Sequence, residues 1–81
     1  MLNLHAITKL SAEDVMKKAV GFFGPGGYGL EIKSQEDGYA YFQGGGGGVE
    51  LSIYPENNKT AVDMITREWE YQVKEFAKDI K

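Results

Sequence analysis

The chain has 81 residues, of which 42% are hydrophobic and 12% aromatic, and it contains no cysteine. This length allows one domain with one core, and the absence of cysteine excludes disulfides and cysteine-based zinc or redox sites. The net charge of −3 and the scattered lysines exclude the clustered basic face that nucleic-acid binding needs. No apolar run approaches the roughly 20 residues of a membrane span. We therefore expect a folded cytoplasmic protein without a secretory signal and without a nucleic-acid or membrane partner.

The first predicted elements are a short strand and an amphipathic helix. Apolar residues alternate with polar ones over 2–9, which predicts a strand. Ser11 is a suitable helix N-cap, and apolar residues then recur every three or four positions up to Phe23, which predicts a helix over 11–23. The glycine- and proline-rich residues 24–27 end this helix, because glycine accepts a left-handed C-cap and proline blocks continuation.

The middle of the chain predicts three strands joined by turns. Asp37-Gly38 separates two runs of alternating hydrophobicity, which is a hairpin signal. A run of five glycines then precedes the third strand, and it is typical of a flexible hairpin loop. The predicted strands are residues 28–33, 39–43 and 49–54.

Residues 55–59 have turn composition, and the segment 60–66 that follows is ambiguous. Its β-branched residues favour a fourth consecutive strand, although it could instead begin one long helix. From about Arg67 to Lys81, apolar residues at spacings of four, three and four predict an amphipathic helix.

The resulting order, β-α-β-β-β-β-α, predicts an α+β fold with two layers. Four consecutive strands with short turns form an antiparallel meander, and each helix has one apolar stripe to bury. We therefore expect both helices on one face of the sheet. The residues predicted to face the helices are Leu30, Ile32, Ala40, Phe42, Val49, Leu51, Ile53, Val62 and Met64. The residues predicted on the opposite face are His5, Glu31, Lys33, Tyr39, Tyr41, Gln43, Glu50, Ser52, Tyr54 and Asp63.

This element order, closed by Thr66-Arg67-Glu68-Trp69-Glu70 leading into an amphipathic helix, resembles two known architectures. One is the repeat unit of TATA-box-binding-protein-like domains, and the other is a minimal helix-grip domain of the lipid- and polyketide-binding superfamily. The resemblance covers the whole chain. It transfers no site residue, and DNA binding does not carry over to an acidic chain.

Three tyrosines on the second sheet face are the most informative surface feature. Tyr39, Tyr41 and Tyr54 each combine an apolar ring with a hydroxyl, which suits protein contacts. They could equally pack flat on the sheet, because strands favour tyrosine. Our leading prediction is a non-enzymatic binding or assembly module that acts through this face as a homodimer.

Four aromatic residues near the helix ends suggest an alternative. Phe22, Phe23, Tyr28 and Trp69 would line an apolar pocket if the C-terminal helix stood away from the sheet. The chain would then be a small carrier for an apolar ligand.

No catalytic residue, metal site or cofactor is predicted. Residues 24–29 satisfy the GxGxxG pattern, but a helix precedes them and a strand follows, which is the reverse of a dinucleotide-binding loop. His5 is the sole histidine, and a mixed metal site with Glu50 or Asp63 is less expected than a solvated side chain. Glu31, Glu50 and Asp63 would act as an acid–base pair only if burial shifted a pKa. A small enzyme of unidentified chemistry is the weakest of the three hypotheses.

Overall fold

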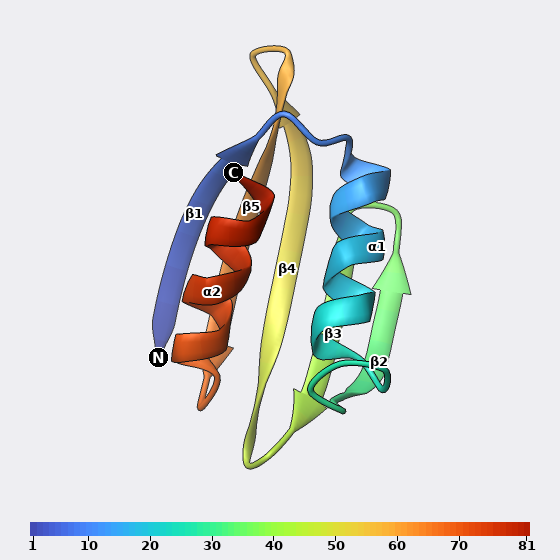
Figure 1. Ribbon diagram of the computed structural model, residues 1–81, viewed down its shortest axis with the longest axis vertical. Coiled ribbons are helices and arrows are strands. Elements are labelled where there is room, and N and C mark those ends of the chain that lie inside the picture. The colour runs from blue at the N-terminus through green and yellow to red at the C-terminus, as the bar shows by residue number, and fades with distance from the viewer.

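The computed structural model describes all 81 residues as one five-stranded antiparallel sheet with two helices packed on one face (Figure 1). The order of strands across the sheet is β1-β5-β4-β3-β2, so β1 and β2 form the two edges. The predicted α+β fold and its element order are confirmed. In chain order the elements are β1 (Leu2–Thr8), α1 (Ala12–Phe23), β2 (Glu31–Glu36), β3 (Tyr39–Gly44), β4 (Gly47–Glu56), β5 (Lys59–Arg67) and α2 (Glu70–Ile80).

Helix α1 begins as the sequence predicts. The Ser11 hydroxyl accepts a hydrogen bond of 3.1 Å from the backbone N–H of Asp14, which satisfies one of the free donors of the first turn. At the other end, the expected left-handed cap is wrong, because Gly24 has an extended backbone with φ −73°. Glycine is still needed there, since a Cβ would lie 2.5 Å from the carbonyl oxygen of Val20.

Strand β2 starts three residues later than the sequence predicts. The backbone N–H groups of Tyr28 and Leu30 donate to the carbonyls of Phe22 and Phe23, each at 2.9 Å. These bonds satisfy the C-terminal carbonyls of α1, and they hold residues 28–30 in a loop despite their alternating hydrophobicity.

A bulge in β2 interrupts the alternation of side chains that the sequence predicts. The register with β3 shifts between Ile32 and Ser34, so that Ser34 lies opposite Tyr41. Lys33 is the extra residue, and the simple alternation predicted for residues 28–33 does not continue past it.

Segment 60–66 is a strand, which confirms the favoured prediction. It lies within β5, between β1 and β4, and is paired along its length with both neighbours. The preceding hairpin turns at Asn57 and Asn58, whose φ angles of 49° and 66° are left-handed and match the twist of a two-residue hairpin. Pro55 therefore belongs to β4. It lies beyond Ser52, the last β4 residue paired with β3, so its missing N–H breaks no ladder.

The five glycines form a tight hairpin, and the expected flexible loop is wrong. Gly45 and Gly46 make the turn with φ angles of 56° and 82°, and the glycines around them belong to β3 and β4. A Cβ on Gly47 would lie 2.1 Å from the Arg67 carbonyl oxygen, and a Cβ on Gly48 would lie 2.6 Å from that of Phe42. Close backbone approach therefore requires glycine at both positions.

Helix α2 begins at Glu70, three residues after the predicted start. Glu68 has a left-handed φ of 77°, which turns the chain out of β5 before the helix begins. Trp69 occupies the N-cap position without a side-chain capping bond, and its Nε1 donates to the carbonyl of Gly44 at 2.9 Å. The indole thereby fastens the start of α2 to the glycine hairpin.

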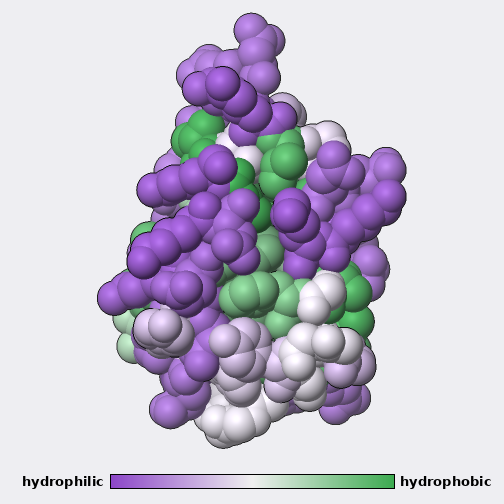
Figure 2. Space-filling view, in the orientation of Figure 1, coloured by the Kyte–Doolittle hydropathy of each residue, from purple (hydrophilic) through white to green (hydrophobic).

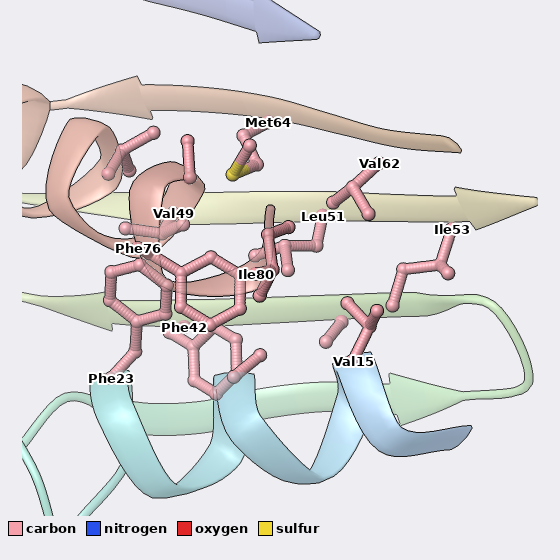
Figure 3. Close-up of a cluster of buried hydrophobic side chains, with 14 of the residues drawn as sticks. Val15, Phe23, Phe42, Val49, Leu51, Ile53, Val62, Met64, Phe76 and Ile80 are labelled. Carbon is pink, nitrogen blue, oxygen red and sulfur yellow. The ribbon is translucent and has the colours of Figure 1, made fainter. Parts of the chain in front are cut away.

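The core lies between the helices and the sheet, and Figure 3 shows its side chains converging from both layers. Phe23 of α1, Phe42 of β3 and Phe76 of α2 are completely or almost completely buried, with Phe23–Phe42 and Phe23–Phe76 ring centroids 5.6 and 5.3 Å apart. All nine residues predicted to face the helices contribute, with Ile32 partly buried at the margin. Each buried large side chain stabilises the fold by about 1.5–3 kcal/mol.

Candidate functional site: the open face of the sheet

The second face of the sheet has no helix or loop packed on it (Figure 1). We call it the open face. Residues that are paired between neighbouring strands lie side by side and form rows across this face. Two rows cross all five strands in the order β1-β5-β4-β3-β2. One row is Asn3, Ile65, Glu50, Tyr41 and Ser34, and the other is His5, Asp63, Ser52, Tyr39 and Glu36.

A hydrogen-bonded triad joins three strands of the open face. His5 on β1 donates from Nδ1 to Oδ1 of Asp63 on β5, with 2.5 Å between the two atoms. The Tyr54 hydroxyl on β4 donates to the other carboxylate oxygen at 2.8 Å. Asp63 is thus held from both sides by side chains of its neighbouring strands.

These contacts shift the proton affinities of the triad. The hydrogen bond with Asp63 raises the pKa of His5 above its ordinary value of 6.5. The same bond, aided by the one from Tyr54, lowers the pKa of Asp63 below 3.8. The bond to Asp63 also raises the pKa of the Tyr54 hydroxyl above 10.0. All three side chains remain solvent-exposed, so the triad is an organised polar surface and not a buried acid–base pair.

The remaining two tyrosines lie on β3. Tyr39 donates its hydroxyl to Glu50 at 2.6 Å, and this bond raises the pKa of the phenol above its ordinary value. The Tyr41 ring passes close to Gly48, where an added Cβ would lie 3.0 Å from both its Cε1 and its hydroxyl oxygen. Tyr39 and Tyr41 are both half-buried, so each leaves part of its surface exposed to solvent.

A shallow depression lies at the glycine end of the open face. Its volume is about 390 Å³, and its rim includes Tyr41, Gln43, Ile65 and Arg67. It exists because Gly48 and its glycine neighbours have no side chains to fill that part of the face. Arg67 has no acidic partner there.

The four aromatic residues expected to line a ligand pocket do lie together, but they contact one another. Phe22 packs against Phe23 and Tyr28 with ring centroids 4.9 and 5.3 Å apart, and Tyr28 packs against Trp69 at 5.8 Å. Figure 2 shows hydrophilic side chains over both helices and only a narrow apolar strip between them. The depression at that strip is about 230 Å³ and is lined in part by Lys18 and Asp79.

Several residues of the open face were not predicted. Ile7, Ile65 and Arg67 belong to it by the register of β1 and β5, and Ser34 joins it through the bulge. Counting by twos from Asp63 would have found Ile65 and Arg67, and counting from His5 would have found Ile7. Nothing in the sequence marks the bulge at Lys33.

No helix combines the length and apolar character needed to cross a lipid bilayer. No group of three or more histidine, aspartate and glutamate side chains is arranged to hold a metal ion. Comparisons with protein-family models, with curated proteins and with solved structures found no match. The geometry of the open face is therefore the basis for a functional proposal.

Proposed function

We propose that the protein is a non-enzymatic binding and assembly module that acts through the open face, with a second copy of the same chain as its occupant. The observation that carries this proposal is a complete sheet face that no part of the chain covers, and on which five polar side chains are already hydrogen-bonded to one another. Because Tyr39, Tyr54, His5 and Asp63 are held in place, ordering them in an interface costs little conformational entropy.

The aromatic content of the face supports a protein partner. Tyrosine is enriched at the centres of protein interfaces, where its ring is buried and its hydroxyl stays bonded. Tyr54 and Ile65 are 37% and 36% exposed, so they offer apolar area to a partner. A small core also gains stability when a second face is buried.

The two edges of the open face differ in charge, and one orientation of a second copy brings unlike edges together. His5 and Arg67 lie on β1 and β5, whereas Glu31 and Glu36 lie on β2 at the other edge. A two-fold axis parallel to the central strand β4 would bring the β1 side of one copy over the β2 side of the other. His5 would then lie over Glu36, and such complementarity fixes orientation in isologous interfaces.

The same axis matches apolar residues. Ile65 and Tyr41 occupy one row on opposite sides of β4, so that Ile65 of one copy would lie over Tyr41 of the other. Tyr54, which is on β4 itself, would lie over its own counterpart. Two sheets packed in this way are about 10 Å apart, which suits interdigitating tyrosine and isoleucine side chains.

The apolar-carrier alternative has less support. Phe23 and Phe76 fill the space between helices and sheet, and the depression between the helices has charged residues in its lining. If a lipid or metabolite panel raised the melting temperature, however, it would favour this alternative, because a ligand of the native state stabilises it.

The test compares tyrosines on the two sides of the molecule. We expect Tyr39→Ser/Tyr41→Ser to fold, as judged by circular dichroism, and to self-associate at least about tenfold more weakly in sedimentation equilibrium. Tyr71→Ser is the matched control, because Tyr71 is 67% exposed on α2, away from the open face. Equal association of all three proteins, or a wild-type chain that stays monomeric at high concentration, would reject the proposal.

A further inference from the structure

The two edges of the sheet differ in how well they are protected from further strand pairing. Edge strand β2 is bulged at Lys33 and carries exposed charged residues at 31, 33 and 36. Bulges and charges are the usual devices that keep an edge from pairing with another chain. Edge strand β1 has neither device. Its seven residues pair with β5 in unbroken register, and it contains no proline, lysine or acidic residue.

From this asymmetry we propose that two copies of the chain pair through their β1 edges, in antiparallel orientation about a two-fold axis at His5, to form one continuous ten-stranded sheet. This proposal does not rest on the function proposed above, because strand pairing uses the free backbone groups of the β1 edge, whereas the open face binds through side chains. An axis perpendicular to the sheet keeps both open faces on the same side.

The side chains of β1 suit this register. Pairing about His5 places Leu4 opposite Ala6 and Asn3 opposite Ile7 of the other copy, and no pair joins two like charges except the histidines. Each His5 is bonded to Asp63 of its own subunit. Leu2 and Leu4 are only partly buried at the margin of the core, so a neighbouring strand would cover apolar area that is now exposed.

Helix α2 lies close enough to the β1 edge to contribute to the edge dimer. It lies over the β1–β5 pair (Figure 1) and follows the direction of β1. Its Glu70 lies 3.9 Å from the amino group of Met1, and the carbonyl of Ile80 accepts a hydrogen bond from the Thr8 hydroxyl. The two-fold axis between the two His5 residues is therefore level with the middle of α2 along the strand direction.

The expected distance between the two helices is favourable. Strands lie about 4.8 Å apart, so a helix centred over β1 and β5 lies about one strand spacing from the axis. The two α2 axes would then be about 10 Å apart, which is the upper end of the range for packed helices.

The side of α2 that faces outward past β1 is also self-complementary. Phe76 packs toward α1 at 5.5 Å from Phe22, and Glu70, Lys74 and Lys81 form a stripe on another side of the helix by helical spacing. In an antiparallel helix pair, Glu70 of one copy would approach Lys81 of the other.

The test introduces like charges at the paired positions. Asn3→Lys/Ile7→Lys would set lysine opposite lysine twice in the proposed register, and like charges directly opposite destabilise strand pairing. We expect the edge dimer of this variant to be at least about tenfold weaker. A second variant, Asn3→Glu/Ile7→Glu, is expected to be equally impaired alone, and an equimolar mixture of the two is expected to restore dimers. Because both side chains are also on the open face, this restoration is the result that identifies the edge dimer, since only the β1–β1 register sets residue 3 opposite residue 7. Gln35→Lys, on the β2 edge, is the control and is expected to pair as the wild type does.

Amide hydrogen exchange gives a second readout that needs no variant. Alternate N–H groups of β1 point away from β5, and we expect their exchange to slow as protein concentration rises. Unchanged exchange in a concentrated sample, or a lysine variant that associates as the wild type does, would overturn the edge proposal. In either case Tyr39→Ser/Tyr41→Ser still reports separately on the open face.

Discussion

The two faces of the sheet use the same alternating strands in different ways. On the covered face, Phe42 and Leu51 are completely buried under the helices, and their removal leaves a cavity. On the open face, Tyr41 and Glu50 occupy the adjacent positions of the same strands and remain half-buried and solvated. The difference shows that alternation decides which residues stabilise the fold and leaves the other set at the surface.

We expect the largest loss of stability when a buried residue of the covered face is truncated. Phe42→Ala is expected to lower the free energy of unfolding by about 3–5 kcal/mol, because a buried phenylalanine leaves both lost transfer energy and a cavity. Tyr41→Ser, one position away on the same strand, is expected to cost about 1 kcal/mol. Urea unfolding of both variants measures the difference. Similar losses in the two would mean that the open face is part of the folding core.

Two glycine substitutions compare the hairpin that joins β3 to β4 with helix α1. Gly48→Ala is expected to destabilise the fold by about 1–3 kcal/mol, because the new Cβ would press on the Phe42 carbonyl and the Tyr41 ring. Gly21→Ala is the control, since nothing lies within 4 Å of its added Cβ in α1. It is expected to stabilise the helix by about 1 kcal/mol. Thermal unfolding of the two should shift in opposite directions.

The bond between α2 and the hairpin is expected to have a smaller effect. Trp69→Phe keeps a ring beside Gly45 but removes the Nε1 donor to the Gly44 carbonyl. One hydrogen bond contributes about 1 kcal/mol net, so unfolding should become easier by about that amount. Amide exchange should also quicken in the hairpin before it quickens in β1. A change confined to β1 would contradict the assigned contact.

The smallest effect concerns the triad on the open face. We expect the His5 ring, followed by NMR, to titrate above 6.5 in the folded chain and to return toward 6.5 in Asp63→Asn. Since the folded pKa is raised, the stabilisation by His5 is fully present below about 6.5 and is lost as pH rises through the folded value. The lowered pKa of Asp63 makes its contribution present above about 3.8 and lost as pH falls through the folded value.

The His5–Asp63 pair should therefore stabilise the folded chain most between about pH 3.8 and 6.5. Dilute samples remove any effect of association on these measurements. An unshifted His5 titration would show that the ring does not keep its bond to Asp63 in solution.

Local patterns in the sequence predicted most of the fold, and the failures have physical causes. The Ser11 cap, the Asp37-Gly38 turn and the alternation of β5 depend on neighbouring residues, so they could be recognised. The loop at residues 28–30 could not, because its geometry is set by hydrogen bonds to the end of α1. The five-glycine run had no readable structure, because close contacts from Arg67 and Phe42 determine it.

The open face was predicted in part for the same reason. Alternation placed its tyrosines and His5 correctly, but it gave no register between strands. The partners His5–Asp63 and Tyr39–Glu50 depend on that register, and so do the rows that set Ile65 level with Tyr41. The register between strands that are distant in sequence decides which exposed side chains become neighbours on the open face. No local sequence pattern encodes this register.

The most direct test of the central claim is an isotope-filtered nuclear Overhauser experiment on a mixture of labelled and unlabelled chains at high concentration. We expect intermolecular contacts between the Ile65 methyl groups and the Tyr41 ring, because the proposed two-fold axis sets these residues over each other. Intermolecular contacts that involve only the helices, or none from the open face in an associated sample, would contradict this expectation.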